Sequence, residues 1–306
     1  MIMKGFRIIA LLSICALLMS ACSSSLQKDA TTLEKKSWAA SDNSVHDVTQ
    51  LEGISIHLKE EGIVTQHKLV DDIPLIEIYR TDAKLLPVMI FLHEHDGNKE
   101  QFVEEAVLYA QSGFFCILFD LKGYGERSLS ESTESLESAV QATDDIDLLL
   151  EYCRLSPYAD AEHFVLYGQS MGGSATWHYA AYGKKTPQAI VACSGACDFT
   201  TLADLGSVSN GKGQSPAWTE ETYMNFCKVN NPITQIERIA QVPALVYQGM
   251  QDHTVLPTST KELEKLLVSA GATNNFFIYD ENGGHNVSPM FLNRILPFLK
   301  QYVRTN

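Results

Sequence analysis

Basic side chains are scarce in this chain. It contains 23 Lys and Arg residues against 37 Asp and Glu residues, which gives a formal net charge of −14 at pH 7. Proteins that bind nucleic acid neutralise phosphates with Lys and Arg, so this balance argues against a nucleic-acid partner. It also provides no electrostatic attraction to anionic lipid headgroups.

The N-terminal apolar stretch is too short for a comfortable membrane span. It runs over residues 8–19, after the basic residues Lys4 and Arg7 and before the small residues Ser20 and Ala21. A basic start, a short hydrophobic segment and small residues are typical of a secretory signal. The sequence therefore predicts an exported protein.

Small residues directly before Cys22 resemble a bacterial lipoprotein signal. The resemblance implies that residues 1–21 are removed and that Cys22 becomes the lipid-bearing first residue of a cell-membrane or outer-membrane lipoprotein, facing the periplasm or the exterior. An ordinary cleaved signal with an incidental cysteine is the alternative. Residues 22–47 are rich in Ser, Thr, Lys and Asp, which predicts a flexible tether, and residues 48–306 suit a single domain. Membrane contact is then expected through the anchor only.

Cys-x-x-Cys pairs are absent among the seven cysteines, which leaves a cysteine-based metal site without support. Cys116 and Cys193 lie in apolar runs and are expected in the core. A disulfide between two of Cys193, Cys197 and Cys227 is an open alternative, because an oxidising compartment would permit it.

Apolar or alternating runs recur eight times, and helical patterns lie between them. The predicted strands are 63–70, 75–79, 88–92, 115–120, 163–167, 189–193, 244–247 and 276–279. The predicted helices are 99–111, 136–154, 171–182, 259–270 and 287–303. This alternation predicts an α/β fold with a doubly wound sheet and an active site at the carboxyl ends of the strands. The later, most apolar strands are expected to be buried on both faces.

The stretch Gly168-Gln169-Ser170-Met171-Gly172 lies between a predicted strand and a predicted helix. Serine at the apex of such a turn is typical of a nucleophile elbow, in which bulky neighbours would clash. Met171 begins the helix, so its N–H is free to bind a developing oxyanion. The stretch therefore predicts a catalytic Ser170.

Two further candidates follow predicted strands. Asp252 comes after strand 244–247, and His285 comes after strand 276–279. The order Ser, Asp, His is that of the α/β-hydrolase fold. We predict that His285 is the general base and that Asp252 orients it. Asp198, after strand 189–193, is the alternative acid.

These motifs resemble bacterial α/β-hydrolases of the dienelactone hydrolase and prolyl-oligopeptidase-like type, over about residues 60–300. Three more stretches carry the resemblance: Phe-Leu-His-Glu-His-Asp-Gly at 91–97, Asp-Leu-Lys-Gly-Tyr-Gly-Glu-Arg-Ser at 120–128, and Asn-Pro-Ile at 231–233. It implies an eight-stranded, mostly parallel sheet, a triad of Ser170, Asp252 and His285, and no cofactor. It also implies a second oxyanion N–H in the turn after the third strand, which we assign to His95. Two departures are a serine where dienelactone hydrolases proper have cysteine, and Glu94 where the family usually has glycine.

Residues 196–230 interrupt the alternation of strands and helices. They contain three glycines and a proline, followed by an aromatic and methionine-containing segment at 218–224. The resembled family commonly places a cap here, so we predict a small lid insertion, with a loose surface loop as the alternative.

His93 and His95 raise the alternative of a metal site, because two histidines one residue apart at a strand end could start one. The following Gly97-Asn98-Lys99 supplies no further ligand. We therefore expect no metal and a structural role for His93.

The resemblance implies a serine hydrolase that cleaves carboxylic esters through an acyl-enzyme. Expected substrates are small-molecule esters, or acetyl or feruloyl groups on polysaccharides. A prolyl-oligopeptidase-like peptidase is one alternative, although residues 23–60 are too few for the propeller of those enzymes. A catalytically silent binding protein of the same fold is another, although no triad member is missing.

Overall fold

The computed structural model describes residues 62–128, 135–204 and 219–303. The predicted signal, Cys22, the predicted tether and residues 205–218 of the predicted lid lie outside the described residues. Within the described part, no helix is long and apolar enough to cross a membrane.

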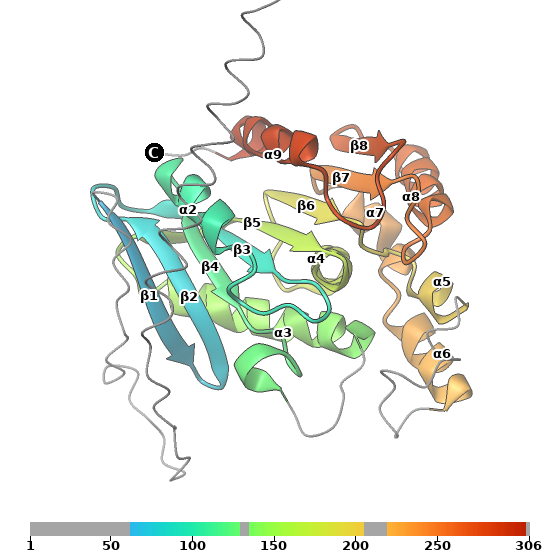
Figure 1. The fold of residues 1–306 in the computed structure, drawn as a ribbon, viewed down its shortest axis with the longest axis horizontal. Coiled ribbons are helices and arrows are strands. Elements are labelled where there is room, and N and C mark those ends of the chain that lie inside the picture. Colours follow the sequence, from blue (N-terminus) through green and yellow to red (C-terminus); the bar gives the residue numbers. More distant parts are fainter. Residues whose placement is uncertain (1–61, 129–134, 205–218, 304–306) are drawn as a thin grey trace, which may run out of the picture. The chain divides into compact units, whose positions relative to one another are not determined.

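Eight strands form one sheet, in the order β1-β2-β4-β3-β5-β6-β7-β8 (Figure 1). The antiparallel pairings are β1 with β2 and β2 with β4, and every other neighbouring pair is parallel. The predicted fold class, a mostly parallel eight-stranded α/β-hydrolase sheet, is confirmed. The strands are β1 Ile63–Val70, β2 Ile73–Arg80, β3 Leu86–Leu92, β4 Phe115–Phe119, β5 Ala159–Gln169, β6 Ala189–Cys193, β7 Ala244–Gly249 and β8 Asn275–Asp280.

Helices cover both faces of the sheet (Figure 1). Side chains of α3, α4 and α8 pack into one buried cluster, and those of α2 and α9 pack into the other. The α-helices are α2 Val103–Gln111, α3 Ser135–Cys153, α4 Met171–Tyr182, α5 Phe199–Asp204, α6 Glu220–Val229, α7 Ile236–Ile239, α8 Pro257–Ser269 and α9 Pro289–Tyr302, and two 3₁₀ turns are η2 Gly125–Arg127 and η3 Pro232–Gln235.

Strand β4 shows why continuous apolar runs build this sheet. Phe115, Ile117 and Phe119 enter one cluster, whereas Cys116 and Leu118 enter the other. Side chains alternate between the two faces of a strand, and helices cover both faces here, so every position must be apolar.

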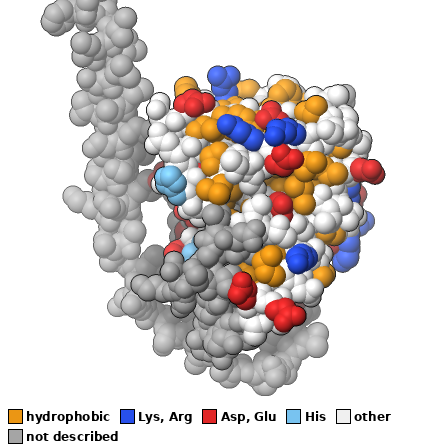
Figure 2. Space-filling model, turned by 90° about the vertical axis from the view of Figure 1, so that its right-hand side faces the viewer, with side chains coloured by type: hydrophobic (Ala, Val, Ile, Leu, Met, Phe, Trp, Pro, Cys, Tyr) orange, Lys and Arg blue, Asp and Glu red, His pale blue; other side chains and the backbone are white. Residues whose placement is uncertain are grey.

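The expected burial on both faces is wrong for β8. This strand pairs only with β7, its residues are partly exposed, and Phe276 is 45% exposed. An edge strand lacks a second neighbour, which explains the exposure. Figure 2 shows one face of the molecule, on which apolar side chains are interspersed with acidic and basic ones.

The described part of the 196–230 segment contains two helices, α5 and α6. Phe199 of α5 packs with Tyr223 and Cys227 of α6 and with Leu136 at the start of α3. The two helices thus share a small apolar cluster with the start of α3, and the lid role stays a prediction.

No disulfide is formed in the described part of the chain. The five cysteines of this part are buried and outside any disulfide, namely Cys116, Cys153, Cys193, Cys197 and Cys227. Cys116 and Cys193 lie in the core, as predicted.

Candidate active site

Ser170 occupies a strained turn between β5 and α4. Its φ of 54° and ψ of −117° lie in a region that non-glycine residues seldom adopt. The glycines on either side are required by close packing, because a Cβ atom on Gly168 would collide with the carbonyl of Gly172, and one on Gly172 with the carbonyl of Leu92. The turn leaves the Ser170 side chain at the carboxyl edge of the sheet.

His285 links Ser170 to Asp252. Its Nε2 lies 2.7 Å from Ser170 Oγ, and its Nδ1 lies 2.8 Å from Asp252 Oδ2. The structure therefore brings together the three residues that were predicted from the sequence, and His285 hydrogen-bonds to both of the others.

The Asp252 carboxylate is buried and well supplied with donors. Its Oδ1 accepts the backbone N–H groups of Thr254 at 2.8 Å and Val255 at 3.0 Å. Burial by itself would raise the pKa of Asp252, but the hydrogen bonds from His285 and from these two amides outweigh it and hold the pKa below its ordinary value. The group is therefore ionised at neutral pH, as an orienting acid must be.

Gln248 supports this loop and was not found from the sequence. Its Nε2 donates to Asp252 Oδ2 at 3.3 Å and to the carbonyl of Val255 at 3.0 Å, while its Oε1 accepts from Thr260 Oγ1 at 2.7 Å. A buried polar side chain must satisfy its hydrogen bonds, and here the partners are the two ends of the Asp252 turn and helix α8. Gln248 thus fixes the position of Asp252.

The loop that carries His285 is held against β7. Tyr247 Oη donates to Asp280 Oδ2 and to the carbonyl of Asn286, each at 3.2 Å. A Cβ atom on Gly249 would collide with the carbonyl of Gly284, so the loop rests directly on the end of the strand.

Two backbone N–H groups are the predicted donors to the oxyanion. Met171 is the first residue of α4, so its N–H has no acceptor within the helix. In the loop after β3, the Glu94 N–H donates to Gln101 Oε1 at 3.0 Å and is therefore occupied. The His95 N–H, the next along the turn, stays the second donor that the family resemblance predicts.

The loop after β4 buttresses the loop after β3. The Leu121 N–H donates to His93 Nε2 at 3.0 Å, and Tyr124 Oη hydrogen-bonds to His95 Nδ1 at 2.7 Å. Asp120 accepts from Lys99 Nζ at 3.0 Å within the same pair of loops. These contacts account for Asp120, Leu121 and Tyr124 of the Asp-Leu-Lys-Gly-Tyr-Gly stretch. The contact of Tyr124 with His95 joins two loops that are far apart in the sequence.

Both ring nitrogens of His93 are engaged inside the protein. Because Nε2 accepts from Leu121, Nδ1 carries the proton and donates to the carbonyl of Glu94 at 2.8 Å. Burial lowers the pKa of His93, which keeps the ring neutral. Within the described residues, no group of three or more His, Cys, Asp or Glu side chains is placed to hold a metal ion.

Asp198, near the start of the 196–230 segment, makes no hydrogen bond to His285. Its Oδ1 accepts from Asn231 Nδ2 at 2.7 Å, and Asn231 Oδ1 in turn accepts the Phe199 N–H at 3.0 Å. The Asn-Pro-Ile stretch thereby ties the two ends of the segment together.

Comparison with known proteins agrees with this geometry. Residues 100–305 match the model of the prolyl oligopeptidase family. The chain belongs to that family. Its members are serine hydrolases of the esterase and peptidase kind, so the chain is a member of a serine hydrolase family.

Individual relatives are distant. The chain is 23% identical over 256 residues to the protein named "Putative esterase YitV" of Bacillus subtilis (strain 168), covering 79% of this chain and 100% of that one. The acetyl xylan esterase from Paenibacillus sp. R4 superposes with a TM-score of 0.66 at 16% identity, over 82% of this chain and 88% of that one. The acylaminoacyl peptidase of Pyrococcus horikoshii gives a TM-score of 0.63 at 18% identity, over 81% of this chain but 43% of that one. These structural likenesses establish the shared fold.

Proposed function

We propose that the protein hydrolyses carboxylic esters, with Ser170 as nucleophile, His285 as general base and Asp252 as the orienting acid. The observation that carries the proposal is the unbroken hydrogen-bond chain from Ser170 Oγ through both ring nitrogens of His285 to a buried, ionised Asp252. Such a chain activates a hydroxyl that is otherwise a weak nucleophile.

The reaction proceeds in two acyl transfers. Ser170 Oγ attacks the ester carbonyl carbon while His285 Nε2 takes the hydroxyl proton. The tetrahedral intermediate then expels the alcohol, which receives that proton from His285, and leaves an acyl group on Ser170. A water molecule gives a proton to His285 and attacks the acyl carbon, and the acid departs as Ser170 regains its proton.

The developing oxyanion is held by the N–H groups of Met171 and His95. Met171 offers its N–H at the start of a helix, where the helix dipole also favours negative charge. His95 is fixed through its ring by Tyr124 and through its loop by His93. Loss of one such donor typically lowers turnover by about 100- to 1000-fold.

An ester substrate is supported by the relative named "Putative esterase YitV", which matches 79% of this chain. The proposed substrate is a small-molecule ester or an ester linked to a polysaccharide, with no nucleic-acid partner. The proposed location is an exported lipoprotein held to the membrane through Cys22 only.

The test is a panel of esters with varied acyl and alcohol groups, together with the matching acyl amides. We expect ester hydrolysis by the wild type, slower amide hydrolysis, and a loss of roughly 10⁴- to 10⁶-fold in kcat for Ser170→Ala. Faster cleavage of amides would make the protein a peptidase, and an inactive wild type would favour the binding-protein alternative. Unchanged turnover in Ser170→Ala would remove Ser170 as nucleophile.

A further inference from the structure

The residue directly before the proposed nucleophile is joined to the loop that carries the second predicted oxyanion donor. Gln169, the last residue of β5, donates from Nε2 to Glu94 Oε2 at 3.1 Å. Gln169 directly precedes Ser170, and Glu94 directly precedes His95. One side-chain hydrogen bond therefore connects the two segments that are predicted to hold the oxyanion.

This hydrogen bond lies just beyond the point at which the backbones of the two segments stop pairing. Strands β3 and β5 pair in parallel as far as Leu92 with Gly168. After the serine, the two segments touch again, because a Cβ atom on Gly172 would collide with the carbonyl of Leu92. The side-chain hydrogen bond thus adds a connection at the end of the strands, where the loop after β3 leaves the sheet.

The peptide unit that joins Glu94 to His95 has a fixed orientation. Its carbonyl oxygen accepts the Gly97 N–H at 3.0 Å and the Nδ1–H of His93 at 2.8 Å. The unit is trans and planar, so its C=O and N–H point in opposite directions. The carbonyl contacts therefore set the direction of the His95 N–H, and the side-chain hydrogen bond sets how far this N–H lies from the nucleophile turn.

The donor of the side-chain hydrogen bond is a buried amide. Gln169 is 9% exposed, and a buried amide must find hydrogen-bond partners inside the protein. Glu94 is half-buried, and its carboxylate is a stronger acceptor than a neutral carbonyl. The resembled family usually has glycine here, and glycine has no side chain that could accept this bond. The departure at Glu94 therefore supplies a contact that the usual residue would not.

We propose that Glu94 is a positioning residue for the oxyanion site. Through Gln169, it holds the His95 N–H close enough to the Met171 N–H for both to bind one oxygen. The inference rests on the proposed ester hydrolysis. An oxyanion exists only in the tetrahedral intermediate and the transition states around it, so loss of Glu94 should lower kcat and leave KM unchanged.

The kinetic test compares Glu94→Ala with Glu94→Gln, whose amide oxygen still accepts from Gln169. With 4-nitrophenyl acetate as substrate, we expect kcat to fall about 10- to 100-fold in Glu94→Ala, because a displacement of about 1 Å can cost about 100-fold. Glu94→Gln should recover most of this loss. Gln169→Ala should reproduce it, and Glu94→Ala/Gln169→Ala should lose no more than either single variant, because both residues act through one hydrogen bond.

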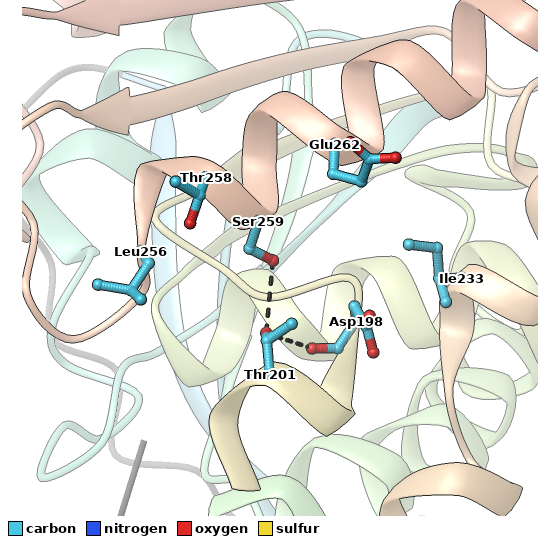
Figure 3. A pocket seen from close by; sticks show the side chains of 7 residues that line it. All are labelled: Asp198, Thr201, Ile233, Leu256, Thr258, Ser259 and Glu262. Atoms are coloured by element: carbon cyan, nitrogen blue, oxygen red, sulfur yellow. Dashed lines mark hydrogen bonds between the residues drawn. The ribbon is translucent and has the colours of Figure 1, made fainter. Parts of the chain in front are cut away.

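Glu262→Ala is the matched control, because it also removes one carboxylate. Glu262 lines a cavity of about 320 Å³ that extends from Asp198 to α8 (Figure 3). The described residues that line this cavity include neither the triad nor the two predicted oxyanion donors. The control should keep the wild-type kcat, and a loss as large as that in Glu94→Ala would overturn the inference.

Binding of trifluoroacetone separates this inference from the proposed function. Ser170 Oγ adds to the ketone carbon, the hydroxyl proton passes to His285, and the ketone oxygen becomes an oxyanion, so the adduct resembles the tetrahedral intermediate. Fluorine NMR measures the affinity of this adduct without any ester. We expect the affinity to fall about 10- to 100-fold in Glu94→Ala and to recover in Glu94→Gln.

That result supports the inference even if the protein cleaves no ester. Equal affinity in the wild type and Glu94→Ala, or no adduct in the wild type, would overturn the inference. So would an unchanged kcat in Glu94→Ala, and ester hydrolysis by Ser170 would then stand without it.

Discussion

Two carboxylates follow neighbouring strands at the same edge of the sheet, and their partners distinguish their roles. Asp252 contacts His285, whereas Asp198 contacts Asn231 and Thr200. We expect Asp252→Asn to lower kcat about 10⁴-fold, because an amide favours the wrong tautomer of His285. Asp198→Asn should cost far less activity. Steady-state kinetics on one ester decides, and a larger loss in Asp198→Asn would reassign the acid.

His178 gives the stability of the protein a pH dependence that is separate from catalysis. It is 5% exposed, its Nδ1 hydrogen-bonds to Thr143 Oγ1 at 2.7 Å, and burial lowers its pKa to about 4. The unfolded chain binds a proton below its ordinary pKa of about 6.5, whereas the folded protein does not until about pH 4. Its contribution is therefore complete above pH 6.5 and is lost as the pH falls toward 4.

The expected size of this effect is roughly 3 kcal/mol of unfolding free energy between pH 6.5 and 4. His178→Asn keeps a hydrogen-bonding group near Thr143 and removes the titration, so it should flatten the pH dependence by about that amount. Urea unfolding at a series of pH values measures it. His163→Asn, at an exposed histidine, is the control, and an unaltered slope in His178→Asn would refute the assignment.

At the scale of elements, the contact between the end of β7 and the His285 loop is a backbone contact without room for a side chain. A methyl group on Gly249 would collide with the Gly284 carbonyl, whereas one on Gly284 has no atom within 4 Å. We expect Gly249→Ala to lower the unfolding free energy by about 1–3 kcal/mol and to reduce kcat by displacing His285. Gly284→Ala should alter thermal unfolding little. Equal effects of the two substitutions on thermal unfolding would contradict this account.

The strands could be predicted well from the sequence, because a strand that is buried on both faces is apolar at every position, as β4 is. The prediction was less accurate where tertiary contacts determine at which residue an element begins. The helix expected over 99–111 begins at Val103, because the Lys99 N–H and Nζ are committed to Asp120 in another loop. Likewise, Ser170, Asp252 and His285 follow strands at motif positions, whereas Gln248 and Tyr124 act through contacts that no local pattern records.

At the scale of the whole molecule, the proposed anchor makes membrane attachment depend on a single residue. Cys22→Ser should move the protein from the membrane fraction to the soluble fraction, because the acidic chain provides no electrostatic attraction to anionic lipid. Ester hydrolysis should persist in the released protein. Fractionation of wild type and variant, with mass spectrometry of the wild-type N-terminus, gives the answer. A variant that stays membrane-bound, or a mature N-terminus other than Cys22, would refute the lipoprotein proposal.

The central claim is that Ser170 is an activated nucleophile. A fluorophosphonate reacts with such a serine to form a phosphonyl ester and release fluoride, and it requires no knowledge of the natural substrate. Peptide mass mapping of the labelled wild type should place one phosphonyl group on Ser170, with labelling abolished in Ser170→Ala and strongly slowed in His285→Ala. Absence of labelling in the folded wild type, or a phosphonyl group on another residue, would contradict the account.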